Sequence, residues 1–252
     1  MKKIVAILLL LGFFYACNNQ NKPAYKAPDF RTFDTAVYYK GLYVSEGYIK
    51  DIKKYKSPRL CQDSFSQAIT IPDSTLKLTC FGVNFHEGGG SYVIVKRGNL
   101  YQLMDAMPND STHKINIDTL YRQDIEIISD NEIKIGQEYY GKIKSGNVIE
   151  EILFAGKYQS ETGSTVEFTA DGKVTGLENY KTYSVMIDYI DEARDVDQVL
   201  LGTNAKDQKE FAFKFKHDTL QIYELKCLEY DKDNHMCGSV DFGKLKYTLV
   251  KK

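Results

Sequence analysis

The sequence lacks the short motifs that mark the commonest enzyme classes. It contains no G-x-S-x-G element around a serine nucleophile and no G-x-x-x-x-G-K-[ST] loop for phosphate. Only four histidines occur, and Gly90 stands where an HExxH zinc motif beginning at His86 would need its second histidine. We therefore expect a protein that is not an enzyme and that needs neither a cofactor nor a metal.

Tryptophan is absent, and no long run of lysine or arginine follows the N-terminal segment of a chain whose formal net charge is −1. Nucleic-acid binding needs a clustered positive surface for the phosphates, so nucleic acid is not expected as a partner. In contrast, the chain holds 19 tyrosines and 13 phenylalanines. These residues gather with β-branched residues in short alternating runs, which favours strands over helices.

The N-terminus has the features of an export signal. Two lysines precede an apolar run, residues 4–14, which is too short to cross a bilayer core of ~30 Å but suits a signal peptide. An ordinary signal peptidase cleaves after small residues, whereas here bulky Phe14 and Tyr15 are followed by Ala16 and Cys17. This pattern resembles the lipobox of bacterial lipoproteins, and its aromatic pair resembles the looser lipobox of Bacteroidetes lipoproteins.

The resemblance implies that residues 1–16 are removed as a signal peptide and that Cys17 is acylated, which makes the membrane a partner. Residues 17–36 would then form the acylated N-terminus and a flexible tether, because they are polar and lack apolar periodicity. No acidic run follows the cysteine. Because such a run accompanies export to the cell surface in Bacteroidetes lipoproteins, the resemblance implies the periplasmic face of the outer membrane. The alternatives are an uncleaved signal anchor and a cysteine that is not lipidated.

Four further cysteines permit two disulfides in an exported protein. Cys227 and Cys237 flank a polar segment, residues 231–235, that predicts a hairpin turn, so we expect these two to pair across adjacent strands. A second disulfide would join Cys61 to Cys80. The alternative is that all four stay reduced and behave as small, half-buried hydrophobic residues.

The chain contains an internal repeat. The pattern G-x-Y-x-S-E occurs at residues 41–46 and at residues 156–161. Two further pairs of segments match in the same order, a turn with a short strand and a closing segment with Gly-Lys-x-Lys: residues 131–135 with 218–222, and residues 140–144 with 242–246. Three matches in one order indicate tandem copies of one fold.

Each copy predicts an antiparallel β domain. In the second copy, residues 166–175 favour a tight hairpin, and three alternating phenylalanines in residues 211–215 favour one face of a strand. The order of these elements resembles the small lipocalin-like β-barrels of Bacteroidetes lipoproteins, which implies a fold but no function. The predicted fold is all-β, with two tandem small antiparallel lipocalin-like barrels over 37–146 and 147–252, and one short helix, residues 46–55, in the first.

One loop is a candidate ligand-binding site, because Asn84, His86 and Glu87 stand beside three glycines. A histidine next to a glutamate would offer an acid/base pair or a metal ligand, or a binding loop at a barrel mouth. The simpler alternative is a glycine-rich hairpin turn, since neighbours on a strand point to opposite faces. The other three histidines lie beside turn residues and are expected to face water.

Three functions stay open on these grounds. The preferred one is a lipid-anchored, non-enzymatic binding or interaction protein of the cell envelope that holds a small apolar ligand in a β-barrel. The alternative is a structural or regulatory partner of envelope proteins, such as an assembly factor or an inhibitor. The third is a hydrolase or a metal-dependent enzyme that uses His86 and Glu87.

Overall fold

The structure is a computed structural model of the chain. It describes residues 41–61, 68–71, 79–80, 91–97, 100–109, 114–144, 147–189, 195–233 and 235–252. Between residues 72 and 122 it describes side chains only for residues 101–104. The described residues form two sets of antiparallel strands with short helical segments, so the all-β prediction is confirmed.

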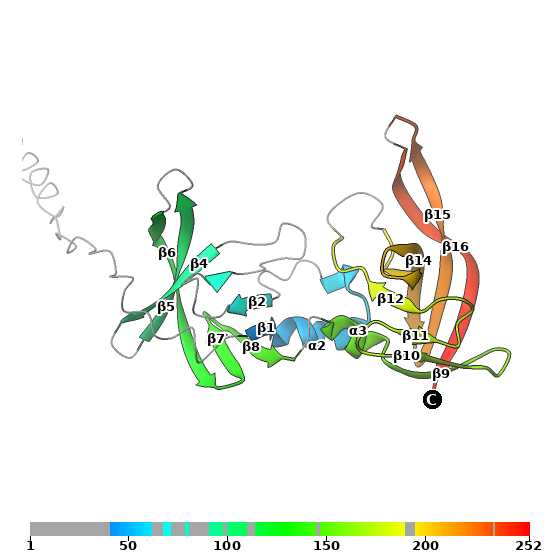
Figure 1. Ribbon diagram of the computed structural model, residues 1–252, viewed down its shortest axis with the longest axis horizontal. Helices are drawn as coiled ribbons and strands as arrows, with labels where there is room; N and C mark the ends of the chain where they lie inside the picture. Colours follow the sequence, from blue (N-terminus) through cyan, green and yellow to red (C-terminus); the bar gives the residue numbers. More distant parts are fainter. Residues whose placement is uncertain are drawn as a thin grey trace, which may run out of the picture.

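The first set of strands is a closed barrel in which neighbours in the sequence are neighbours in space (Figure 1). Strand β1 closes it, because Leu42 pairs with Thr70 of β2 on one side and with Ile143 of β8 on the other. The strands are β1 (Gly41–Ser45), β2 (Ala68–Ile71), β3 (Thr79–Cys80), β4 (Ser91–Arg97), β5 (Leu100–Asn109), β6 (Lys114–Ser129), β7 (Glu132–Ile135) and β8 (Glu138–Ile143).

The second set is a curled sheet with the order β11-β10-β9-β16-β15-β14-β13-β12. Its two outer strands meet at one end, where Val174 N–H donates to Lys181 O (2.9 Å) and Tyr183 N–H donates to Gly172 O (2.8 Å). The strands are β9 (Gly156–Ser160), β10 (Thr165–Phe168), β11 (Val174–Thr175), β12 (Thr182–Val185), β13 (Gln198–Asn204), β14 (Asp207–Lys216), β15 (Thr219–Asp231) and β16 (Met236–Lys251).

The G-x-Y repeat occupies equivalent positions in the two sheets. It forms β1 and β9, and each of these first strands pairs with the last strand of its own set. Tyr43 and Tyr158 are both 0% exposed. A lysine of the last strand lies over each tyrosine ring, with Nζ of Lys142 and of Lys251 each 5.7 Å from the ring centre. The two copies therefore share a local structure as well as a sequence pattern.

The closing match of the repeat is wrong in register. Residues 140–144 lie beside β1. In contrast, residues 242–246 lie further toward the N-terminal end of β16, where Phe242 pairs with Leu225 of β15. The residue that matches Lys142 is Lys251, since their backbone N–H groups bond to Asn131 O and to Asp218 O in the same way. Strand β16 is longer than β8, so its Gly-Lys segment does not occupy the position that the Gly-Lys segment of β8 has beside its first strand.

The helix expected at residues 46–55 is α2 (Glu46–Tyr55). The Ser45 hydroxyl caps its start by accepting a hydrogen bond from Tyr48 N–H (2.9 Å), and Lys56 ends it in a left-handed conformation with φ of 52°. Its buried residues, Tyr48 and Ile52, are four apart and share one face. The sequence therefore specifies both ends of this helix and its apolar face.

The apolar face of α2 packs into the core of the second sheet. Tyr48 and Ile52 join a cluster with Tyr158, Phe168 and many other residues of that sheet. A second helix, α3 (Val148–Leu153), which the sequence analysis did not predict, contacts α2 and contributes to the same cluster. Both helices lie between the two sets of strands (Figure 1). The helix that was expected in the first domain therefore also contributes to the core of the second sheet.

The β15–β16 hairpin extends beyond the rest of its sheet (Figure 1). Cys227 and Cys237 form a disulfide within it, with a Cα–Cα distance of 5.8 Å, in the hairpin where the pairing was expected. Three large apolar side chains on this extension are more than half exposed, at 51% for Leu228, 58% for Tyr230 and 54% for Met236. The disulfide therefore cross-links a two-stranded ribbon whose apolar side chains are exposed to water.

Removing this disulfide should loosen the hairpin without unfolding the sheet. The bond closes a short loop, with a sequence separation of 10. From the loop-closure entropy, its removal should lower the free energy of opening the hairpin by about 2–3 kcal/mol. In the double variant Cys227→Ser/Cys237→Ser, hydrogen exchange measured by mass spectrometry should rise over residues 226–240. Exchange in β13 serves as the internal control. Unchanged exchange over 226–240 would contradict the expectation.

Candidate functional site

The loop with Asn84, His86 and Glu87 lies outside the described residues, as does Cys17. The loop site and the lipidation therefore stay predictions. Cys61 is buried, with 3% of its surface exposed, but the side chain of Cys80 is not described, so that pairing stays a prediction too.

Two of the remaining histidines fit the expectation that they lie at turns and face water. His217 and His235 both have positive φ, 56° and 55°, and both side chains are exposed. His113 lies outside the described residues.

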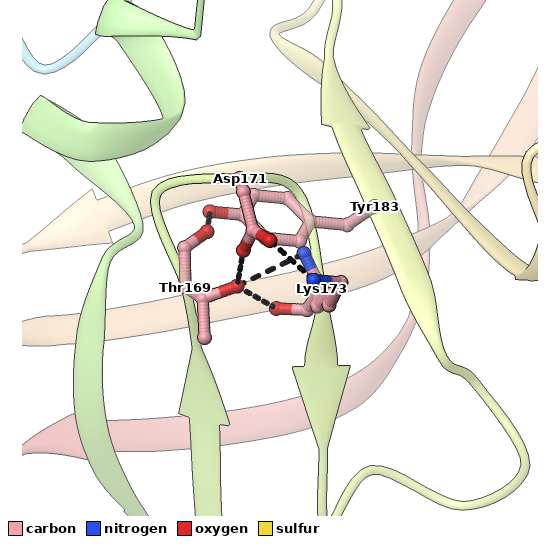
Figure 2. Close-up of polar contacts among 4 residues, drawn as sticks. All are labelled: Thr169, Asp171, Lys173 and Tyr183. Carbon is pink, nitrogen blue, oxygen red and sulfur yellow. Dashed lines mark hydrogen bonds and ion pairs between the residues drawn. The ribbon is translucent and has the colours of Figure 1, made fainter. Parts of the chain in front are cut away.

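A dense polar cluster occurs at the turn between β10 and β11 (Figure 2). Asp171 accepts hydrogen bonds from the Lys173 ammonium and the Thr169 hydroxyl, and Tyr183 donates to Thr169 O (2.7 Å). The Lys173 bond, followed by the Thr169 bond, lowers the pKa of Asp171. Each of these groups helps to hold the turn, which was predicted within residues 166–175, so the cluster has a structural role.

The interior of the second sheet is filled with aromatic rings. Phe154, which follows α3 directly, is 0% exposed and lies against four rings. The ring centres are 5.0 Å away for Phe213, 5.5 Å for Phe168 and for Tyr183, and 5.8 Å for Phe215. Rings at these distances pack as a core. The space around Phe154 is therefore occupied by the protein's own side chains.

A groove of about 730 Å³ opens where α2, α3 and the end of the first barrel meet. Its apolar floor comes from four different elements: Val44 of β1, Ile49 of α2, Ile143 of β8, and Val148 and Ile152 of α3. A volume of this size falls within the range of small-molecule sites, about 300–1,000 Å³. We call this space, with the floor residues named above, the junction groove.

The junction groove lies beside the buried face of α2, and Ile49 contributes to both, since it also packs against the core cluster. Tyr48 and Ile52 turn into the core, whereas Ile49, Lys50 and Lys53 line the groove. The spacing of Ile49 and Lys53 places them on one face of the helix.

Charged side chains line the junction groove above its apolar floor. Lys50, Lys53 and Lys142 supply three positive charges, against two negative charges from Glu46 and Glu151. Glu138 fixes the helix to the barrel here, since its Oε1 accepts from the Ser45 hydroxyl (2.5 Å) and from Gly47 N–H (3.0 Å). An apolar floor with an excess of positive charge at the rim suits a ligand that is apolar at one end and anionic at the other.

Among the described residues, no three metal-ligating side chains gather in one place. No described helix has both the length and the apolar character needed to span a bilayer. Comparison of the chain with protein-family models, with curated proteins and with solved structures finds no match. The junction groove is therefore interpreted from its own geometry and charge.

Proposed function

We propose that the protein is a lipid-anchored, non-enzymatic binding protein of the cell envelope, and that its ligand is an anionic amphiphile held in the junction groove. The observation that carries the proposal is the groove itself, with its apolar floor and its lysine-rich rim. The filled interior of the second sheet supports this placement over a ligand inside that sheet. Acylation of Cys17 would hold the groove close to a membrane, where amphiphiles are concentrated.

The groove offers both parts of such an interaction. The half-buried side chains of Ile49 and Ile152 would cover an aliphatic chain, at about 25 cal/mol for each Å² of apolar surface removed from water. Exposed Lys50 and Lys53 would lie near an anionic group at the rim. Because these lysines are exposed, their contribution should weaken as salt is added.

The test measures binding of dodecanoate to the chain from residue 18 onward by isothermal titration. The variant Ile152→Asp places a carboxylate in the apolar floor, and Ile49→Asp does the same from the facing helix. Each should weaken binding at least about tenfold, which corresponds to about 1.4 kcal/mol. The matched control is Ile128→Asp on β6, where the native side chain is already 42% exposed. Absence of saturable binding by the native chain, or equal affinities for all three variants, would refute the proposal.

A second candidate function is that of a structural or regulatory partner of envelope proteins. The exposed Leu228, Tyr230 and Met236 on the stapled hairpin favour it, because apolar groups held in water on a rigid ribbon are typical of an interaction surface. Capture of one stoichiometric partner from solubilised envelope, lost in Tyr230→Ser/Met236→Ser, would support this function. Equal capture by the variant would argue against it.

A further inference from the structure

A smaller hollow of about 190 Å³ lies next to the junction groove. It opens where the end of α2, the end of α3, the β14–β15 turn and the last strand come together. Lys53 and Ile152 line both spaces, so these two side chains lie at the boundary between the groove and the hollow. Its other lining residues are Lys56, Leu153, Phe215, His217, Asp218 and Lys251.

Positive charge dominates this hollow. Lys53, Lys56 and Lys251 face it, with Asp218 as the one carboxylate in its lining. None of the three lysines forms an ion pair within the part of the chain that the structure describes. Three lysines against one aspartate give the lining of the hollow an excess of two positive charges.

Two of these lysines are held in place by groups that do not neutralise them. Lys56 Nζ donates to the backbone carbonyl of His217 (2.8 Å) and lies 5.5 Å from the centre of the Phe215 ring. Lys251 Nζ lies over the Tyr158 ring. The C-terminal end of α2 itself favours cations, which accounts for Lys53. The helix end does not account for Lys251, which lies on β16, the last strand of the second sheet.

We infer that this hollow binds a phosphate group, and that the junction groove and the hollow together take a phosphorylated amphiphile. The inference rests on the proposed function and adds the chemical class of the head group. Lys53, at the boundary of the two spaces, would contact both parts of the ligand. A phosphate carries about −1.5 to −2 charges at neutral pH, which matches the excess of two positive charges in the hollow, whereas a carboxylate carries one. Lysine is a common ligand for phosphate, as a point charge.

The experiment compares three probes on the chain from residue 18 onward: dodecyl phosphate, dodecanoate and inorganic phosphate. The test variant is Lys56→Gln/Lys251→Gln, which removes two charges without touching the apolar floor. The control variant is Lys134→Gln in the first barrel, where the lysine also lies over a ring, that of Tyr139, at 5.2 Å. The native chain should bind dodecyl phosphate at least about tenfold more tightly than dodecanoate. The test variant should lose this preference, and the control variant should keep it.

The probes also separate the sources of the phosphate. Saturable binding of inorganic phosphate that the test variant loses would show that the free ion suffices. Binding of both amphiphiles without binding of inorganic phosphate would assign the hollow to a lipid head group. Equal affinity of the native chain for dodecyl phosphate and dodecanoate, or an unchanged preference in the test variant, would overturn the inference while leaving the proposed function intact. Binding of inorganic phosphate without binding of either amphiphile would instead refute the proposed function and keep the anion site.

Discussion

Replacement of Phe154 by alanine should lower the free energy of unfolding by about 3–5 kcal/mol, the largest effect that we expect from a single side chain. Phe154 is fully buried and is in contact with four aromatic rings, which belong to β10, β12 and β14. These rings sit on strands that are fixed by backbone hydrogen bonds, so they cannot move far into the space that the substitution leaves.

Urea unfolding followed by circular dichroism would measure the effect. Phe242→Ala is the matched control, because Phe242 is only half-buried and meets one ring, that of Tyr223, edge to face with 5.0 Å between the ring centres. We expect the control substitution to lower the free energy of unfolding by about 1–2 kcal/mol or less. The reason is that Phe242 is partly exposed and its removal exposes less buried apolar surface. Similar losses in the two variants would show that Phe154 does not anchor the core.

Gly176→Ala should be as damaging, for a backbone reason. Gly176 has φ of 76°, and an added Cβ would lie 2.1 Å from Thr165 O. That carbonyl belongs to β10, so relief of the overlap requires a shift of a strand that is paired with β9 and with β11. We expect a loss of stability of more than about 4 kcal/mol, beyond the usual range for a single substitution.

The control for this prediction is Gly163→Ala. Gly163 has a similar φ of 82°, but the nearest atom to an added Cβ is Gln159 Nε2, at 3.9 Å. The control therefore measures the left-handed conformation alone, which costs about 1–2 kcal/mol in a residue with a side chain. The difference between the two midpoints in urea isolates the steric overlap. If the two variants unfold at the same urea concentration, the overlap does not exist in solution.

Local patterns predicted the features whose causes are local. The Cys227–Cys237 hairpin, the helix from Glu46 to Tyr55 and the turn at Asp171 each depend on residues that are close in the sequence. The G-x-Y repeat was informative for the same reason, since its tyrosine is buried in both copies. Periodicity and turn chemistry act over about ten residues and suffice for such elements.

The features that the sequence did not reveal depend on distant residues. α2 packs with a sheet that begins about a hundred positions later in the chain, and nothing in its own amphipathic pattern names that partner. α3 has six residues, too few for a periodic signal. The lysine hollow combines positions 53, 56 and 251, and the junction groove combines two helices with two strands of the barrel. The predicted loop site was chosen from neighbouring residues, and it lies outside the residues that the structure describes.

The pairing of each first strand with its own last strand also sets an order of events in folding. Tyr43 pairs with Lys142, and Gln159 with Val250, so each closure joins residues about 90–100 positions apart. Contacts at such separations form slowly, because the entropy of a long loop is lost before any contact is gained. Hairpins such as β15–β16 should therefore form first, and the seams at β1 and β9 last. Since α2 follows β1 directly, the junction groove would be completed only at the final step, and a ligand bound there would select fully folded molecules.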